Sequence, residues 1–171
     1  MNRHPSQPLQ PAVWLGVPFL LAIVATFLFS IPLRLFTLAL PEPVFPIVLA
    51  FAWAVIRPSV LGPFAVLFLG LFLDLFWGGP IGLWPLSLLA GYSLILLSRN
   101  LMVGQGPEIL FGWYLAATGA AMGTAYLAIL LTTGEAPNAL GTVWQYLVTA
   151  ALYPLAHYLI ERFEDADVRF R

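Results

Sequence analysis

Residues 70–83 read GLFLDLFWGGPIGL, an apolar run with one acid that ends in a glycine-rich turn. The acid is Asp74, and the turn Gly78-Gly79-Pro80-Ile81-Gly82 begins one helical turn after it. The apolar character continues on both sides, over residues 60–77 and 82–98. Glycine and proline in this order typically end one element and begin the next. The stretch therefore predicts two apolar helices that form a tight hairpin, with a carboxylate near their junction.

The rest of the chain is equally apolar. Of its 171 residues 61% are hydrophobic and 9% are charged, whereas charged residues make up about 25% of a typical soluble domain. So little charge cannot cover the surface of a soluble domain of this size. A net charge of −1 argues against a basic nucleic-acid-binding face, and the absence of cysteine excludes disulfides, cysteine metal sites and thiol nucleophiles. We expect an integral membrane protein.

Six apolar spans are predicted, and together they make one transmembrane domain. They cover residues 13–33, 45–56, 60–77, 82–98, 109–132 and 142–160, with a short cytoplasmic tail over 161–171. Crossing the hydrocarbon core takes about 20 helical residues. The second span is shorter, so we expect it either to borrow from Phe36–Leu40 or to be a partly broken helix. The first is too long for the apolar region of a signal peptide and is interpreted as a retained span.

Charge placement predicts the orientation. With the N-terminus in the cytoplasm, the inner segments hold Arg3, Arg57, Arg99 and the arginines of the tail, and only Arg34 lies outside. This is the positive-inside pattern, and it requires the short second span to be counted. The six tryptophans fall near predicted span ends, as an aromatic belt would place them. The predicted fold is an all-α bundle of six transmembrane helices with both termini inside.

Asp74 is the only acid well inside an apolar run. An ionisable residue at membrane depth is by default a candidate functional residue, and a carboxylate near a helix C-terminus is disfavoured by the helix dipole. We favour a structural pin, in which backbone N–H groups of the turn 78–82 bind the carboxylate, or Arg34 pairs with it instead. A contact to a partner protein and a proton- or ligand-binding role remain as alternatives.

Small residues recur along the fifth span. They are Gly112, Ala116, Ala120 and Thr124 on one stripe and Gly119 and Gly123 on another. Ser87 and Gly91 give the fourth span a similar patch. Small residues let helix backbones approach closely. Packing inside the bundle is the default interpretation, and packing against the helix of another protein is the sharper alternative.

The sequence offers little for catalysis. It has no His-Glu-x-x-His metal site, no Gly-x-Ser-x-Gly elbow and no phosphate loop, and a single embedded acid cannot form an aspartate dyad. His157 is expected at the inner end of the sixth span, bonded to nearby backbone, and Glu108 and Glu135 are interpreted as solvated loop residues. We therefore predict a protein that is not an enzyme, with no cofactor and no metal.

The stretch 46–98 resembles the bacterial rod shape-determining MreD family. The resemblance is carried by Trp53-x-x-x-Arg57-Pro58 at the end of the second span, followed by Gly70-x-x-x-Asp74-x-x-x-Gly78-x-Pro80-x-Gly82, and it covers about a third of the chain. The six spans and short loops fit that family across the rest.

This resemblance implies a non-catalytic scaffold subunit of the cell-elongation machinery in the inner membrane, acting in lateral peptidoglycan synthesis. Its expected partners are MreC and, in the same complex, MreB, RodA and the elongation-specific class B penicillin-binding protein. The family is similar in fold to the substrate-binding subunits of energy-coupling-factor transporters, and such a subunit is the alternative function. Those subunits dock their coupling partner through an Ala-x-x-x-Ala patch in the first helix, where this chain has Ala22-x-x-x-Thr26.

Overall fold

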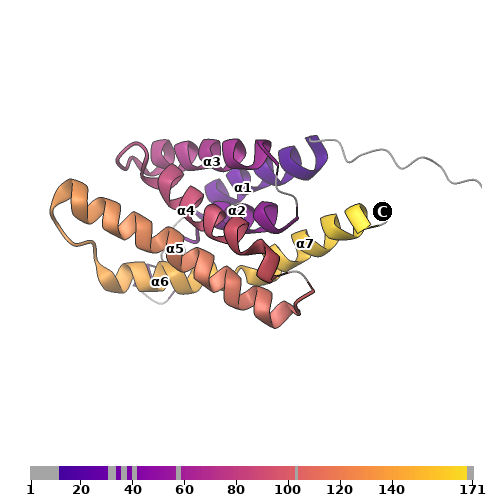
Figure 1. The fold of residues 1–171 in the computed structure, drawn as a ribbon. Helices are drawn as coiled ribbons and strands as arrows, with labels where there is room; N and C mark the ends of the chain where they lie inside the picture. Colours follow the sequence, from indigo (N-terminus) through magenta and orange to yellow (C-terminus); the bar gives the residue numbers. More distant parts are fainter. Residues whose placement is uncertain are drawn as a thin grey trace, which may run out of the picture.

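The computed structural model describes residues 12–30, 34–35, 38–39, 42–56, 59–102 and 104–168. A π-helical turn, Ala12–Gly16, leads into α1 (Val17–Phe29), and a short hairpin of β1 (Arg34–Leu35) and β2 (Leu38–Ala39) follows. The other helices are α2 (Phe45–Ile56), α3 (Leu61–Trp77), α4 (Leu83–Ser98), the 3₁₀ turn Arg99–Leu101, α5 (Pro107–Thr133), α6 (Ala139–Ala150) and α7 (Tyr153–Val168). Apart from the β-hairpin the elements are helical (Figure 1), so the predicted all-α class is confirmed.

Helix α2 is the central element of the bundle. Every residue from Phe45 to Ala54 is buried, and the helix packs against α1, α3, α4, α5 and α7. A helix that is apolar on all sides is expected to be enclosed in this way. Its bounds match the predicted span 45–56, but the expected extension into Phe36–Leu40 is wrong, because Leu38–Ala39 pairs as a strand with Arg34–Leu35.

The predicted sixth span, 142–160, is not one helix. Helix α6 ends at Ala150 and α7 begins at Tyr153, and the two follow one another along the lower edge of the bundle (Figure 1). Pro154 explains the break, because it has no N–H to donate to the carbonyl of Ala150 and its ring disfavours a continuous helix. Helix α7 then runs on to Val168, into the segment predicted as a tail.

Three of the six tryptophans are buried in the bundle, which the belt prediction did not expect. Trp14, Trp53 and Trp84 are buried, and Trp144 is exposed. The indole Nε1 of Trp53 donates to the carbonyl of Trp14, 3.3 Å away. Trp53 is therefore a core residue that joins α2 to the start of the first helix, and not a membrane-interface anchor.

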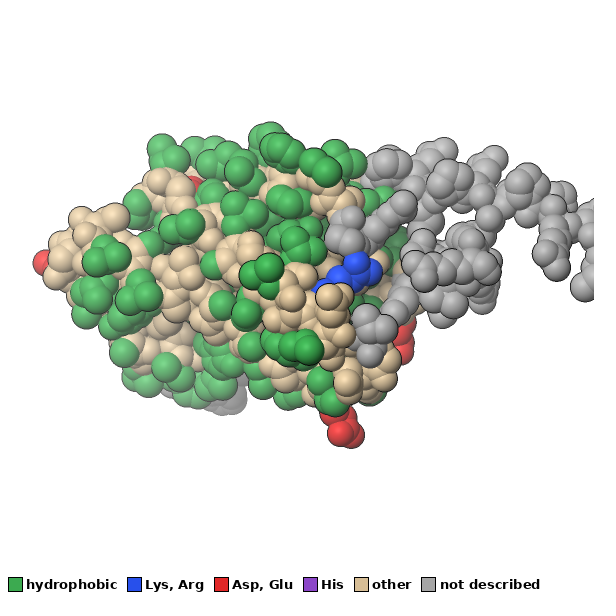
Figure 2. All heavy atoms as spheres, in the orientation of Figure 1, with side chains coloured by type: hydrophobic (Ala, Val, Ile, Leu, Met, Phe, Trp, Pro, Cys, Tyr) green, Lys and Arg blue, Asp and Glu red, His purple; other side chains and the backbone are tan. Residues whose placement is uncertain are grey.

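The outer surface of the bundle is rich in large apolar side chains. Leu97 and Leu131 are 84% and 82% exposed, and Leu20, Phe68 and Leu75 are also exposed. Figure 2 shows hydrophobic side chains spread over the displayed face, with few charged groups among them. Among the described residues, α5 is the one helix long and apolar enough to cross a membrane, and α2, α3 and the helix over Trp14–Phe29 are apolar but shorter.

Candidate functional site

The hairpin of α3 and α4 is organised around the carboxylate of Asp74. This side chain is 2% exposed, and its two oxygens accept hydrogen bonds from the backbone nitrogens of Gly82 (2.6 Å) and Trp84 (2.9 Å). Gly82 is the N-cap residue of α4 and has no side chain with which to cap it. Asp74 thus supplies from α3 the capping carboxylate that α4 lacks, and its negative charge lies at the positive end of the α4 dipole. The pin interpretation placed the donors in the turn 78–82, which Gly82 satisfies, whereas the second donor, Trp84, lies in the first turn of α4.

Two glycines make the turn between the helices possible. Gly78 ends α3 with φ +68° and donates its N–H to the carbonyl of Asp74, and Gly82 has φ +98°. Residues with a Cβ rarely adopt these left-handed conformations. Between them, the carbonyl of Pro80 accepts from the backbone N–H of Leu83. Gly79 is half-buried, and a Cβ on it would meet only the side chain of Leu83.

Glycine also sets how closely the helices pack. A Cβ on Gly70 would lie 2.4 Å from the backbone Cα and N of Pro85, and one on Gly91 would lie 2.9 Å from the carbonyl oxygen of Ala117. Contacts this short with backbone cannot be relieved by turning a side chain. The helix pairs α3–α4 and α4–α5 therefore depend on these glycines for their close approach.

A polar network that the sequence did not reveal lies beside the hairpin turn. Trp77 donates its indole N–H to Oε2 of Glu42 (2.8 Å), and the side-chain amide of Gln145 donates to the carbonyl of Glu42 (3.1 Å). The rings of Trp77 and Trp84 lie 4.9 Å apart at 58°. Glu42 thus joins the start of α2 to both the hairpin and α6. The prolines on either side of Glu42 indicated a turn, but they gave no indication of the hydrogen-bond partners of Glu42.

Several predicted site residues fall outside what the structure describes. Arg57 and Pro58 lie outside the described residues, and so does the side chain of Arg34, whose proposed pairing with Asp74 is left open. Of the motif Trp53-x-x-x-Arg57-Pro58, only Trp53 can be placed, in the core of α2.

The predicted small-residue stripe of α5 lies largely outside the intramolecular packing. Gly112, Ala116 and Gly123 are exposed, and a Cβ on Gly112 or Gly123 would meet no atom within 4 Å. Gly119 and Ala120 are half-buried, with Gly119 facing Tyr146 of α6. The face of α5 buried in the bundle instead carries Tyr114, Ala117, Thr118, Ala121, Met122 and Ala125. For Gly112, Ala116 and Gly123 the default interpretation, packing inside the bundle, is therefore wrong.

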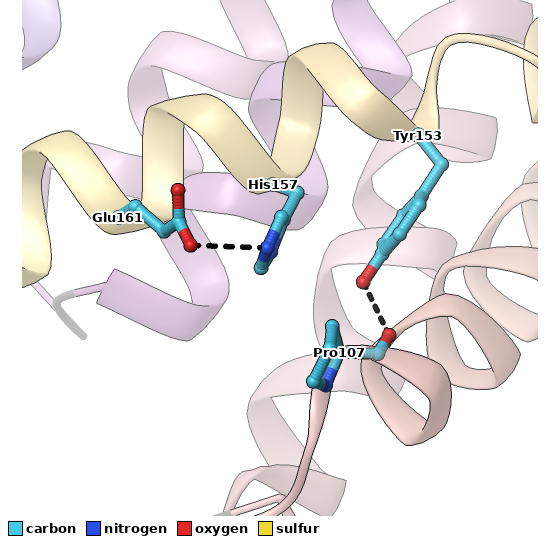
Figure 3. A network of polar contacts seen from close by, with 4 residues as sticks. All are labelled: Pro107, Tyr153, His157 and Glu161. Atoms are coloured by element: carbon cyan, nitrogen blue, oxygen red, sulfur yellow. Dashed lines mark hydrogen bonds and ion pairs between the residues drawn. The ribbon is translucent and has the colours of Figure 1, made fainter.

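A second group of polar contacts joins α7 to the start of α5 (Figure 3). Tyr153 donates its hydroxyl to the carbonyl of Pro107, and its ring stacks on that of His157 at an interplanar angle of 17°. The Nε2 atom of His157 lies 3.2 Å from Oε1 of Glu161. The predicted backbone bond of His157 is therefore wrong, because its partner is a carboxylate one helical turn away.

Comparison of the chain with known protein families, curated proteins and solved structures gives no match.

Proposed function

We propose that this chain is a multi-pass protein of the bacterial cytoplasmic membrane and a non-catalytic scaffold subunit of the cell-elongation complex. Its spans are α1, α2, α3, α4, α5 and the broken pair α6–α7, with both termini inside. The apolar surface supports the embedding, because exposed leucines such as Leu97 and Leu131 would be costly in water and cost nothing against lipid.

Contacts between helix ends are consistent with spans that alternate in direction. Residues predicted at outer ends meet each other, as Glu42 meets Trp77 and Gln145. Residues predicted at inner ends do the same, as Trp53 meets Trp14. A chain that alternates direction at each turn would produce this sorting.

The observation that carries the scaffold function is the way the embedded acid is used. Both oxygens of Asp74 accept backbone hydrogen bonds within the hairpin. Because both oxygens are already bonded inside the hairpin, this carboxylate is poorly placed to bind a substrate. The hairpin that bears the family resemblance is therefore a rigid structural unit, which suits a subunit whose role is to hold partners.

The exposed face of α5 offers a surface for such a partner. Gly112, Ala116 and Gly123 are exposed and separated by four and seven residues, so they lie along one side of the helix. In lipid, small residues drive helix association because they allow close van der Waals contact. We assign the transmembrane segment of MreC as the partner, with MreB, RodA and the class B penicillin-binding protein reached through the same complex.

The alternative, a substrate-binding subunit of an energy-coupling-factor transporter, is less well supported. Docking through the first helix would need Ala22 and Thr26 to face outward. Both are buried in the bundle, and the Thr26 hydroxyl donates to the carbonyl of Ala22. The chain therefore departs from the Ala-x-x-x-Ala pattern, and the helix face that would dock a coupling partner is buried.

A pull-down from native membranes, read by mass spectrometry, tests the proposal. The scaffold function predicts recovery of MreC, and the transporter alternative predicts an ATPase complex. Gly112→Leu and Gly123→Leu should lower MreC recovery, whereas Ser93→Leu, an exposed small residue on α4, is the matched control and should not. Depletion of the protein should turn rod-shaped cells round. Recovery of an ATPase complex without MreC would overturn the proposal.

A further inference from the structure

A groove opens between the first half of α5 and the break that separates α6 from α7. Its volume is about 770 Å³, and its walls are formed by Phe111 and Leu115 of α5, Leu147 and Ala150 of α6, and Pro154 of α7. Apart from Glu108 and two tyrosines, its lining residues are apolar. None of the contacts described above fills it.

The groove is too short for a membrane-spanning helix. It runs along α5 from Pro107 to Leu115, nine residues whose eight steps rise about 12 Å. Beyond Leu115 it is closed by Tyr146, whose hydroxyl donates to the Leu115 carbonyl (3.3 Å). The hollow past Tyr146 is a separate and smaller one of about 330 Å³. Half of a hydrocarbon core of ~30 Å is about 15 Å, so the groove has the depth of one leaflet.

One acidic residue, Glu108, lies at the end of the groove that the proposed orientation places at the inner membrane face. Glu108 is exposed in the first turn of α5, and no Arg side chain among the described residues forms an ion pair with it. On α7, Tyr153 reaches the start of α5 at Pro107, whereas the carboxylate of Glu161 is directed at His157 (Figure 3). The hydroxyl of Tyr153 is already bonded to Pro107, and Glu161 is paired with His157. Glu108 is the one carboxylate among the lining residues of the groove, so its charge is the one that an occupant would meet there.

We infer that this groove holds one acyl chain of an inner-leaflet phospholipid whose headgroup carries an amine, such as phosphatidylethanolamine. The acyl chain lies against Phe111, Leu115 and Leu147, and the ammonium group pairs with Glu108. An anionic headgroup would instead meet this carboxylate with like charge. The inference rests on the embedding and orientation proposed above, which place the start of α5 at the inner membrane face, and it is independent of the elongation partners.

Native mass spectrometry of the full-length protein purified in detergent tests the inference. The protein is offered equal amounts of phosphatidylethanolamine and phosphatidylglycerol with the same acyl chains. One phosphatidylethanolamine should be retained, with a preference of roughly threefold, as expected for one partly exposed ion pair. Glu108→Gln should abolish the preference but keep lipid binding. Glu135→Gln, an exposed acid beyond the other end of α5, is the control and should keep the preference.

A second pair of variants tests the groove itself. Leu147→Trp should fill it and lower retention of both lipids, whereas Leu140→Trp lies seven residues earlier on α6, outside the groove, and should not. Equal retention of the two lipids, or unchanged retention in Leu147→Trp, would overturn the inference. A photo-crosslinker at Leu147 that captures a protein helix in native membranes would also overturn it. A failed MreC pull-down with lipid selection intact would instead reject only the elongation function.

Discussion

The Oδ1 atom of Asp74, one turn before the end of α3, lies 2.9 Å from the backbone nitrogen of Trp84 in the first turn of α4. The two residues are ten positions apart, and the turn between them is folded so that an acid of one helix caps the next. In water this cap would be a modest local stabiliser. In a buried site the backbone N–H of Trp84 has no water to replace the lost bond. Removing the bond should therefore cost more free energy of unfolding.

Asp74→Ala should therefore destabilise the protein strongly without preventing membrane insertion. It leaves the N–H groups of Gly82 and Trp84 unpaired, at about 1–3 kcal/mol each. Asp74→Asn keeps one acceptor oxygen and should cost about half as much. Unfolding in detergent, followed by thermal melting or denaturant titration, measures the difference. Glu135→Ala, which removes an exposed acid, serves as the control. Wild-type stability in Asp74→Ala would reject the pin.

A pair of glycine substitutions should give opposite results. Gly70→Ala places a Cβ 2.4 Å from the backbone of Pro85, so the hairpin must separate and stability should fall by about 1–3 kcal/mol. Gly112→Ala adds its Cβ in open space and should be neutral or stabilise by up to ~1 kcal/mol, because alanine is the better helix former. The same unfolding assay compares them. Equal effects would mean that helix propensity, and not close packing, governs both positions.

The hairpin was the part of the fold most accessible from sequence. Its helices and turn were predicted to within a residue of α3 and α4, because apolar runs punctuated by glycine and proline are a local signal. The pin on Asp74 could be proposed for the same reason, since the carboxylate and its donors are ten or fewer residues apart. The sequence pattern could predict this part of the fold because the contacts join residues that are close along the chain.

Relations between distant elements could not be predicted in this way. Hydropathy treats a lipid-facing tryptophan and a core tryptophan alike, so the burial of Trp53 was missed. The bond from Trp77 to Glu42 spans 35 positions, and no periodicity in either segment indicates it. The break before Tyr153 did have a signal in Pro154, but prolines near helix starts are also tolerated, and only packing decides between the two.

The contact between Glu42 and Trp77 should be measurable as a coupling energy. Glu42→Ala and Trp77→Phe each remove one side of the same hydrogen bond, so the double variant should lose less stability than the sum of the two singles, by about 0.5–1.5 kcal/mol. Glu108→Ala combined with Trp77→Phe is the control cycle and should be additive, because Glu108 lies beyond the opposite end of α4. Additivity in both cycles would show that Glu42 and Trp77 do not interact in the membrane.

Maleimide labelling of single introduced cysteines should report the orientation of α4. The chain has no cysteine of its own, so no other position in it would be labelled. Ile81→Cys lies in the exposed turn before α4, and Gln105→Cys lies in the exposed loop after it. In intact spheroplasts a membrane-impermeant maleimide should label Ile81→Cys, and it should reach Gln105→Cys only after permeabilisation. Labelling of both without permeabilisation would mean that α4 does not cross the membrane. The reverse pattern would place Arg99 and Glu108 outside and would reject the both-ends-inside orientation, together with the inner-leaflet position of the groove.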